Sequence, residues 1–187
     1  MKNQVLVLLG LTGAVGLALY GCEREGNGEG PRTSGPKSPR ARAELVDVQG
    51  RAVGTAEFSP DGQGVRVALD LRGLPPGTHG LHLHEKGRCD RPGFESAGAH
   101  FNPHGRKHGL MNPEGPHAGD FPNITVGADG TFRGAFLAPY VTLGAGPTSV
   151  FAGEGTCLMM HAGPDDGMTD PSGGSGDRIA CGALKKD

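Results

Sequence analysis

The feature that most limits what this chain can fold into is a long stretch, from Gly87 to Phe121, with no apolar periodicity. It is rich in His, Pro, Gly and Asn, and a second stretch of this kind runs from Ala162 to Asp177. Loops of this length are uncommon inside a compact domain and usually carry function. The fold must therefore be a framework that can hold two long loops.

The framework is predicted to consist of short β-strands. Polar residues alternate with a row of apolar ones, Val65, Val67, Leu69 and Leu71. This is the period of a strand with one buried face. Residues 59–62 (Ser-Pro-Asp-Gly) and 129–130 (Asp-Gly) are typical of hairpin turns. The 35 glycines and 15 prolines, against 5% aromatic residues, favour an all-β barrel or sandwich over a helical bundle.

The first 22 residues carry a targeting signal. Lys2 precedes an apolar run that ends at Tyr20, and Gly21 and Cys22 follow. Because spanning a bilayer takes about 20 apolar residues, this shorter run is predicted to be a signal peptide that is removed on export. The sequence LYGC at 19–22 resembles a bacterial lipobox, whose cysteine carries a lipid, although Tyr20 replaces the usual small residue. The alternative is an ordinary secretory signal with an incidental cysteine.

Residues 23–42 are predicted to be a flexible linker, and residues 43–187 the folded domain. The linker is mostly Gly, Pro, Ser, Arg and Glu and has no large apolar residue, so it cannot build a core. A flexible chain of this length spans roughly 20–25 Å, enough to hold the domain off a membrane. With acyl chains on Cys22, the predicted localisation is the cell envelope, exported and anchored by lipid.

Six of the eight histidines follow a pattern typical of a metal site. His82 and His84 are one residue apart, so on a strand both rings project from one face while Leu81 and Leu83 face the core. That spacing alone is a weak signal, because it occurs in many proteins. Further potential ligands follow in the loops, namely His100, His108, His117, Asp120 and His161. Isolated histidines are usually packing residues, but a cluster this dense is more often a metal site.

Several segments resemble the copper,zinc superoxide dismutase family, and together they span nearly the whole domain from Ala43. They are GLHLHEKG from Gly80, SAGAHFNP from Ser96, RKHG from Arg106, GPHAGDFPN from Gly115, HAGPDD from His161 and SGDRIACG from Ser175. The spacing from His100 to Asp120 matches that family without a gap. The resemblance implies an eight-stranded Greek-key β-barrel or sandwich, immunoglobulin-like, with two long loops forming the metal site.

The resemblance also implies one copper ion and one zinc ion per subunit. Copper would be held by His82, His84, His100 and His161. Zinc would be held by His100, His108, His117 and Asp120. The shared ring of His100 would lose both protons, which two nearby cations favour. Asp165 would orient one copper ligand and one zinc ligand. The catalytic residues would be His100 and Arg178, with Arg178 attracting and positioning the anion beside copper.

The remaining cysteines and histidines are given structural roles. Cys89 and Cys181 are a candidate disulfide pair, which export permits and which would add about 4–5 kcal/mol of stability on a chain-entropy model. Cys157 lies in an apolar, strand-like run and is expected to be a buried, unpaired thiol. His79 is expected to be structural and His104 to be solvent-exposed.

The predicted activity is that of an oxidoreductase that converts superoxide to dioxygen and hydrogen peroxide and protects the cell envelope. A net charge of -2 and scattered Lys and Arg argue against a nucleic-acid partner. The loop before Arg178 contains four Asp and no Lys. We therefore expect a rate that depends on salt but is not outstanding, because a local positive field must overcome a negative surrounding.

Two other functions were weighed on the same residues. A metal-binding lipoprotein that buffers copper or zinc without turnover would be expected to have lost a copper ligand or Arg178, and none is missing. A purely structural β-domain would leave the histidine-rich loop unexplained. No apolar patch on a strand stands out as an interface, so the sequence leaves a monomer and a homodimer both open.

Overall fold

The computed structural model describes residues 38–187. The signal peptide and lipid attachment predicted for residues 1–22, and most of the predicted linker, lie outside this range. The first strand begins at Ala41, so Ala41 and Arg42 belong to the folded domain and not to the linker. In the described part of the chain, no helix is long and apolar enough to cross a membrane.

Nearly all regular structure in the described residues is β, as the composition predicted. One short 3-10 turn, η1 (Glu95–Ala97), lies in the first long loop. The strands are β1 (Ala41–Asp47), β2 (Ala52–Asp61), β3 (Gly64–Leu71), β4 (Gly77–His79), β5 (Leu81–His84), β6 (Ile124–Val126), β7 (Phe132–Ala138), β8 (Cys157–His161), β9 (Arg178–Ala183) and β10 (Lys185–Lys186).

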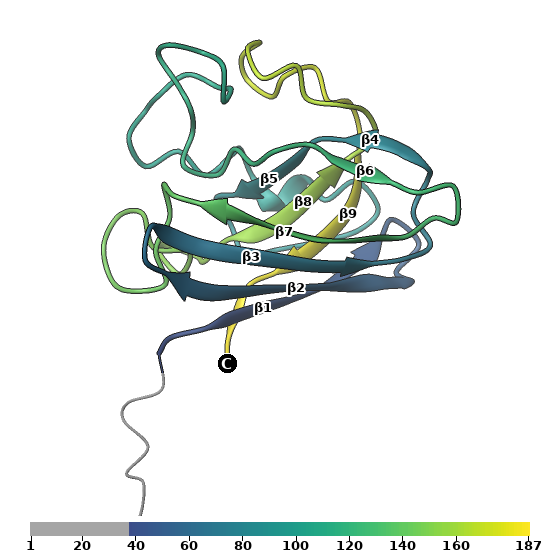
Figure 1. The fold of residues 1–187 in the computed structure, drawn as a ribbon, viewed down its shortest axis with the longest axis horizontal. Coiled ribbons are helices and arrows are strands. Elements are labelled where there is room, and N and C mark those ends of the chain that lie inside the picture. The colour runs from purple at the N-terminus through teal and green to yellow at the C-terminus, as the bar shows by residue number, and fades with distance from the viewer. Residues whose placement is uncertain (1–37) are drawn as a thin grey trace, which may run out of the picture. The chain divides into compact units, whose positions relative to one another are not determined.

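The main sheet has eight strands and curls over the core. Seven of them follow the order β5-β8-β9-β1-β2-β3-β7, and β10 pairs with β1. All these pairings are antiparallel. The chain leaves β7 at one end of this order and enters β8 near the other, which is the long return connection of a Greek key. In Figure 1, β2, β3 and β7 lie in front of β5, β8 and β9, and the core fills the space between.

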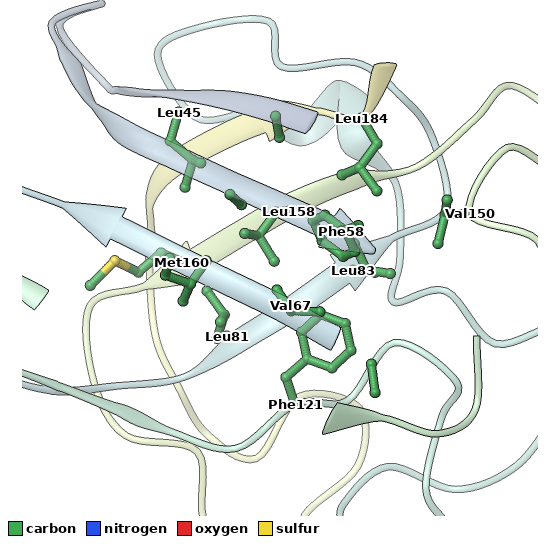
Figure 2. Packing of buried hydrophobic residues seen from close by; sticks show 14 of the residues in the cluster. Leu45, Phe58, Val67, Leu81, Leu83, Phe121, Val150, Leu158, Met160 and Leu184 are labelled. Carbon is green, nitrogen blue, oxygen red and sulfur yellow. The ribbon is translucent and has the colours of Figure 1, made fainter. Parts of the chain in front are cut away.

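The predicted alternation along β3 is confirmed. Val65, Val67, Leu69 and Leu71 are buried, whereas Arg66 and Asp70 are exposed. The hairpin before β3 differs from the prediction, because Ser59 and Pro60 continue β2 and the turn falls at residues 62–63. The core between the two halves of the sheet contains buried side chains from most strands (Figure 2), including Leu45, Phe58, Val67, Leu81, Leu83, Leu158 and Met160.

The two long loops leave the sheet between β5 and β6 and between β8 and β9. Figure 1 shows them on the same side of the molecule. They are joined by a reciprocal pair of hydrogen bonds, because the Asn123 side chain accepts from the backbone N–H of Asp165 at 2.9 Å and donates to its carbonyl at 2.8 Å. The fold therefore brings two histidine-bearing segments, distant in sequence, to one place.

Candidate metal centre

The strand β5 supplies two histidines in the way the sequence predicted. Leu81 and Leu83 belong to the core, while His82 and His84 point to the opposite face because side chains alternate along a strand. The first long loop folds back against β5 through two backbone hydrogen bonds. The N–H of Leu83 donates to the Gly119 carbonyl at 2.8 Å, and the Leu83 carbonyl accepts from the N–H of Phe101 at 2.8 Å. Both rings are held on this covered face and are almost fully buried.

The four histidines predicted to bind copper come together. Their ligand nitrogens lie within 4.8 Å of one another, although they come from β5, the first loop and β8. One nitrogen of each ring is buried without a hydrogen-bond partner: His82 Nδ1, His84 Nε2, His100 Nε2 and His161 Nε2. A buried polar atom without a partner costs free energy, so four in one place are the donor set that a cation would satisfy.

The other nitrogen of each of these rings is engaged. His84 Nδ1 donates to the Gly98 carbonyl at 2.9 Å, and His161 Nδ1 donates to the Gly176 carbonyl at 2.9 Å. A ring that donates from one nitrogen presents a lone pair on the other, and such partners fix the tautomer and the orientation of metal-binding histidines. These backbone contacts were not predicted, because nothing in the sequence says which loop carbonyls will face a ring.

The residues predicted to bind zinc converge on one carboxylate oxygen. Oδ1 of Asp120 lies 3.1 Å from His100 Nδ1, 3.0 Å from His108 Nδ1 and 3.3 Å from His117 Nδ1. Ligands around a tetrahedral zinc ion at about 2.0–2.1 Å are about 3.3 Å apart. The other oxygen, Oδ2, accepts the backbone N–H groups of Gly109 at 2.8 Å and His117 at 2.9 Å. The three distances from Asp120 Oδ1 to the ring nitrogens are therefore close to the ligand spacing of a tetrahedral zinc site.

His82 also lies within 4.8 Å of ligand atoms of His100, His108 and Asp120. Its Nε2 is occupied by a hydrogen bond to Asp165 at 2.7 Å, and its Nδ1 belongs to the group of unpartnered nitrogens. His117, whose Nδ1 is 3.4 Å from His100 Nδ1, is therefore the better fourth member of this cluster. His100 is then common to both clusters, with Nδ1 in one and Nε2 in the other.

Asp165 links the two clusters from behind. Its Oδ2 accepts from His82 Nε2 at 2.7 Å, and its Oδ1 accepts from His108 Nε2 at 3.1 Å. Oδ1 also accepts the Gly167 N–H at 2.6 Å. The contacts with His82 and His108, one to a ring of each cluster, are those that the family resemblance implied for Asp165. Asp166, beside it, instead accepts two backbone N–H groups of its own turn, at 2.8 and 2.9 Å.

Burial keeps the rings of the first cluster neutral. Desolvation lowers the pKa of His84 to about 2, and it lowers the pKa values of His100 and His161 to about 4. The same cause lowers the pKa of His82. A neutral imidazole is the form that binds a metal, so these rings need not lose a proton to solvent at neutral pH before they coordinate.

The second cluster holds charge when no metal is bound. Burial works against a charged His108 ring, but hydrogen bonds to Asp120 and Asp165 outweigh it and raise the pKa of His108 to about 9. Burial would likewise raise the pKa values of both carboxyl groups, yet hydrogen bonds from the histidines hold them well below the usual range. A cation that enters this cluster must therefore displace a proton.

An open pocket of about 620 Å³ leads to the first cluster, and His84, His100, His161 and Arg178 line it. The guanidinium of Arg178 is fixed by two backbone carbonyls, donating to Phe94 at 2.7 Å and to Gly98 at 2.8 Å. A positive charge is thus held at a set position beside the histidines.

Comparison with known protein families identifies the family of this chain. The family model for copper/zinc superoxide dismutase matches residues 52–184. The chain belongs to the copper/zinc superoxide dismutase family. Cu-Zn superoxide dismutase 2 of Aquifex aeolicus is 49% identical to it over 148 residues, which cover 78% of this chain and 86% of that protein.

Solved structures of the family agree with the fold. A SOD-like protein from Bacillus subtilis superposes with a TM-score of 0.75 at 43% identity, covering 77% of this chain and 97% of that one. The Cu/Zn superoxide dismutase from Brucella abortus superposes with a TM-score of 0.65 at 29% identity, covering 78% and 99%. As an enzyme of this family, the chain uses copper and zinc as cofactors, and the two clusters could hold them.

The predicted disulfide is present and lies next to the site. Cys89 and Cys181 are bonded, with their Cα atoms 5.7 Å apart. Cys181 lies on β9, the strand that begins with Arg178. Cys89 lies in the loop segment whose carbonyls at Phe94 and Gly98 hold the guanidinium. The disulfide therefore joins the strand that carries Arg178 to the loop segment whose carbonyls hold its guanidinium.

The two histidines left out of the metal set are where the sequence placed them. His79 is buried and structural, with its ring nitrogens 2.8 Å from the His161 carbonyl and 2.9 Å from the Pro75 carbonyl. His104 is exposed on the loop.

Two residues important to the site were missed. Asn123 joins the two loops at Asp165, and Asp170 accepts the His108 N–H at 2.6 Å and pairs with Lys107 at 2.9 Å. Asn123 is the last residue of one of the segments that resemble the family, and this position could have indicated its role. Asp170 gave no signal beyond being one of several acidic residues in a loop.

Proposed function

We propose that this chain disproportionates superoxide to dioxygen and hydrogen peroxide at a copper–zinc site bridged by His100. The observation that carries the proposal is the group of four buried ring nitrogens without partners, next to a pocket that three of these histidines line together with Arg178. A purely structural domain would gain nothing from four unsatisfied nitrogens. A cation there, reached by a small anion through the pocket, accounts for both features.

The ligand sets follow from the nitrogens that are free. Copper would be held by His82 Nδ1 and by Nε2 of His84, His100 and His161. Zinc would be held by Nδ1 of His100, His108 and His117 and by Asp120 Oδ1. Imidazole suits both metals, and three nitrogens with one carboxylate form a closed site of the structural type.

The chain's own residues bind the substrate and handle its protons. Bound copper would supply the one-electron transfers, taking an electron from one superoxide and giving one to the next. Arg178 draws the anion into the pocket and orients it, since its guanidinium is already fixed by two carbonyls. His100 lines the pocket, and its Nε2, which has no hydrogen-bond partner, is the nitrogen free to hold a proton for the peroxide product. Asp165 keeps His82 and His108 in the tautomers that coordinate.

The competing function is metal buffering at the envelope without turnover. This alternative is tested directly because a protein of the same fold from Bacillus subtilis carries the name SOD-like. The test is a dismutation assay on copper- and zinc-loaded protein, with His161→Ala removing one free nitrogen and His104→Ala as the exposed control. We expect loss of activity in the first variant, with zinc retained, and none in the second. If the wild-type chain binds both metals but does not turn over superoxide, it is a buffer.

We further propose that residues 1–22 direct export, that Cys22 carries the lipid, and that residues 23–40 tether the domain so that it removes superoxide at the cell envelope. The disulfide between Cys89 and Cys181 supports export, because disulfides persist in oxidising compartments. Mass spectrometry of the N-terminal peptide from the bacterial membrane fraction tests the anchor. A mature chain that begins elsewhere than Cys22, or carries no acyl mass, contradicts it.

A further inference from the structure

A second group of metal-binding atoms lies outside the histidine site. The sulfur atoms of Cys89, Cys157 and Cys181 all lie within 4.8 Å of one another. Two of them form the disulfide, and Cys157 is a free, buried thiol. They belong to a small apolar cluster with Phe94 and Met159, separate from the main core.

The sheet register places this sulfur group one strand away from the histidines. Cys157 pairs directly with His84 across β5 and β8, and Met159 pairs with His82 on one side and with Cys181 on the other. Directly opposed residues of antiparallel strands share a face. One face of β5, β8 and β9 therefore carries imidazole, thioether and thiol groups in adjacent positions.

The disulfide can be reached from solvent, whereas the third sulfur cannot. A surface groove of about 490 Å³ is lined by Cys89 and Cys181 together with Lys185 and Lys186. Cys89 is half-buried, while Cys157 is completely buried. Cys157 does not line this groove, so a reductant in solvent meets the disulfide first. A reductant can thus reduce the disulfide while the buried thiol of Cys157 is left unchanged.

We propose that reduction of the Cys89–Cys181 disulfide creates a site for a soft monovalent cation, Cu(I), held by the sulfurs of Cys89, Cys157 and Cys181. Three sulfurs around an ion at about 2.3 Å lie about 4 Å apart. The Cys157 sulfur already lies within 4.8 Å of both disulfide sulfurs, and the sulfurs of Cys89 and Cys181 can separate once their bond is reduced. Thiolates select Cu(I) over harder ions. In the oxidised chain two of the three sulfurs are bonded to each other, so the site exists only in the reduced chain.

The chemistry balances with a named reductant. A phosphine takes an oxygen atom from water and becomes the phosphine oxide, and the two sulfurs each gain a proton. Cu(I) then displaces one proton from each thiol that coordinates, because a coordinating thiol is deprotonated.

The test reads sulfur directly and does not depend on dismutase activity. The full chain is reduced with a phosphine under anaerobic conditions, Cu(I) is added as its acetonitrile complex, and X-ray absorption counts the sulfur neighbours of copper. We expect sulfur neighbours in the reduced chain and their loss in the oxidised chain. Copper with nitrogen neighbours alone in the reduced chain overturns the proposal.

Matched variants locate the site. Cys157→Ala should lose one sulfur neighbour and bind Cu(I) more weakly, while Cys22→Ala should keep the full sulfur signal. An unchanged signal in the first variant, or a lost signal in the second, places copper elsewhere and overturns the proposal. Circular dichroism of each reduced protein and formation of the Cys89–Cys181 bond on reoxidation report folding, and Cys157→Val replaces Cys157→Ala if the smaller side chain unfolds the domain.

Discussion

Replacing Asp165 tests whether the hydrogen bonds behind the two clusters set their metal affinity. The carboxylate accepts from His82 Nε2 at 2.7 Å and from His108 Nε2 at 3.1 Å. In Asp165→Ala both rings lose the acceptor that keeps their N–H groups on Nε2. A neutral ring can then carry its proton on Nδ1, the nitrogen that would coordinate. Both metals should therefore bind more weakly.

The size of the loss follows from the role of such partners. Removing an acceptor behind a metal-binding histidine typically lowers metal affinity 10–100-fold, which corresponds to about 1.4–2.8 kcal/mol. One ring of each cluster is affected, so we expect a loss of this size for copper and for zinc. Asp165→Asn keeps one acceptor oxygen but presents an N–H group to the other ring. We expect it to weaken the binding of one metal and spare the other.

The assay is a competition titration of the metal-free protein with chelators of known affinity, run separately for copper and zinc. Asp166→Ala is the matched control, because it also removes backbone hydrogen bonds from the same loop but touches no ring. If Asp165→Ala binds both metals as tightly as Asp166→Ala, orientation of the rings by Asp165 does not determine affinity, and the reasoning is wrong.

Three further predictions concern charge and stability. Arg178→Ala should lower kcat/KM for superoxide roughly 10-fold or more and flatten its dependence on ionic strength. If stopped-flow rates of the variant keep the salt dependence of the wild type, Arg178 does not steer the anion. In the metal-free protein, His84, His100 and His161 have lowered pKa values. Below pH 6.5 the unfolded chain therefore binds more protons than the folded chain. The free energy of unfolding should fall by on the order of 1.4 kcal/mol per pH unit for each ring as the pH drops from 6.5 toward 4. The raised pKa of His108, about 9, adds stability that is complete below pH 6.5 and is lost progressively as the pH rises from 6.5 through 9. Urea unfolding of the metal-free protein should therefore show maximum stability near pH 6.5, and a flat profile from pH 4 to 9 would contradict both shifts. Cys89→Ser should lower the free energy of unfolding by about 2–5 kcal/mol, measured by urea unfolding of the oxidised proteins, and an unchanged midpoint would show that the disulfide does not stabilise the fold.

Part of the architecture was predictable because it depends on local periodicity. The alternation along β3 and the His-x-His pair on β5 follow from the geometry of a strand, and the loops followed from missing periodicity. The start of β1 at Ala41 was missed, because Ala and Arg carry no strand signal. Ser59 and Pro60 were mistaken for a turn, since only pairing with β3 shows that the strand continues to Asp61.

The partners of each ring could not be predicted in the same way. His84 and Arg178 both bond to the Gly98 carbonyl, and Asn123 fixes Asp165 across two loops. A backbone carbonyl is present at every residue, so the sequence cannot show which one will face a histidine. The proximity of Cys157 to the disulfide is likewise determined by the register of the strands.

The amino-acid sequence by itself determined the kinds of donor available, the strand that carries His82 and His84, and the family to which their spacing belongs. Only the tertiary structure decided which nitrogen of each ring is free, which carboxylate oxygen gathers three imidazoles, and where the third sulfur lies. The physical reason is that donor chemistry is a property of single residues, whereas a binding site is a set of distances between residues far apart in the chain. Those distances are set by the pairing of strands and the closure of loops.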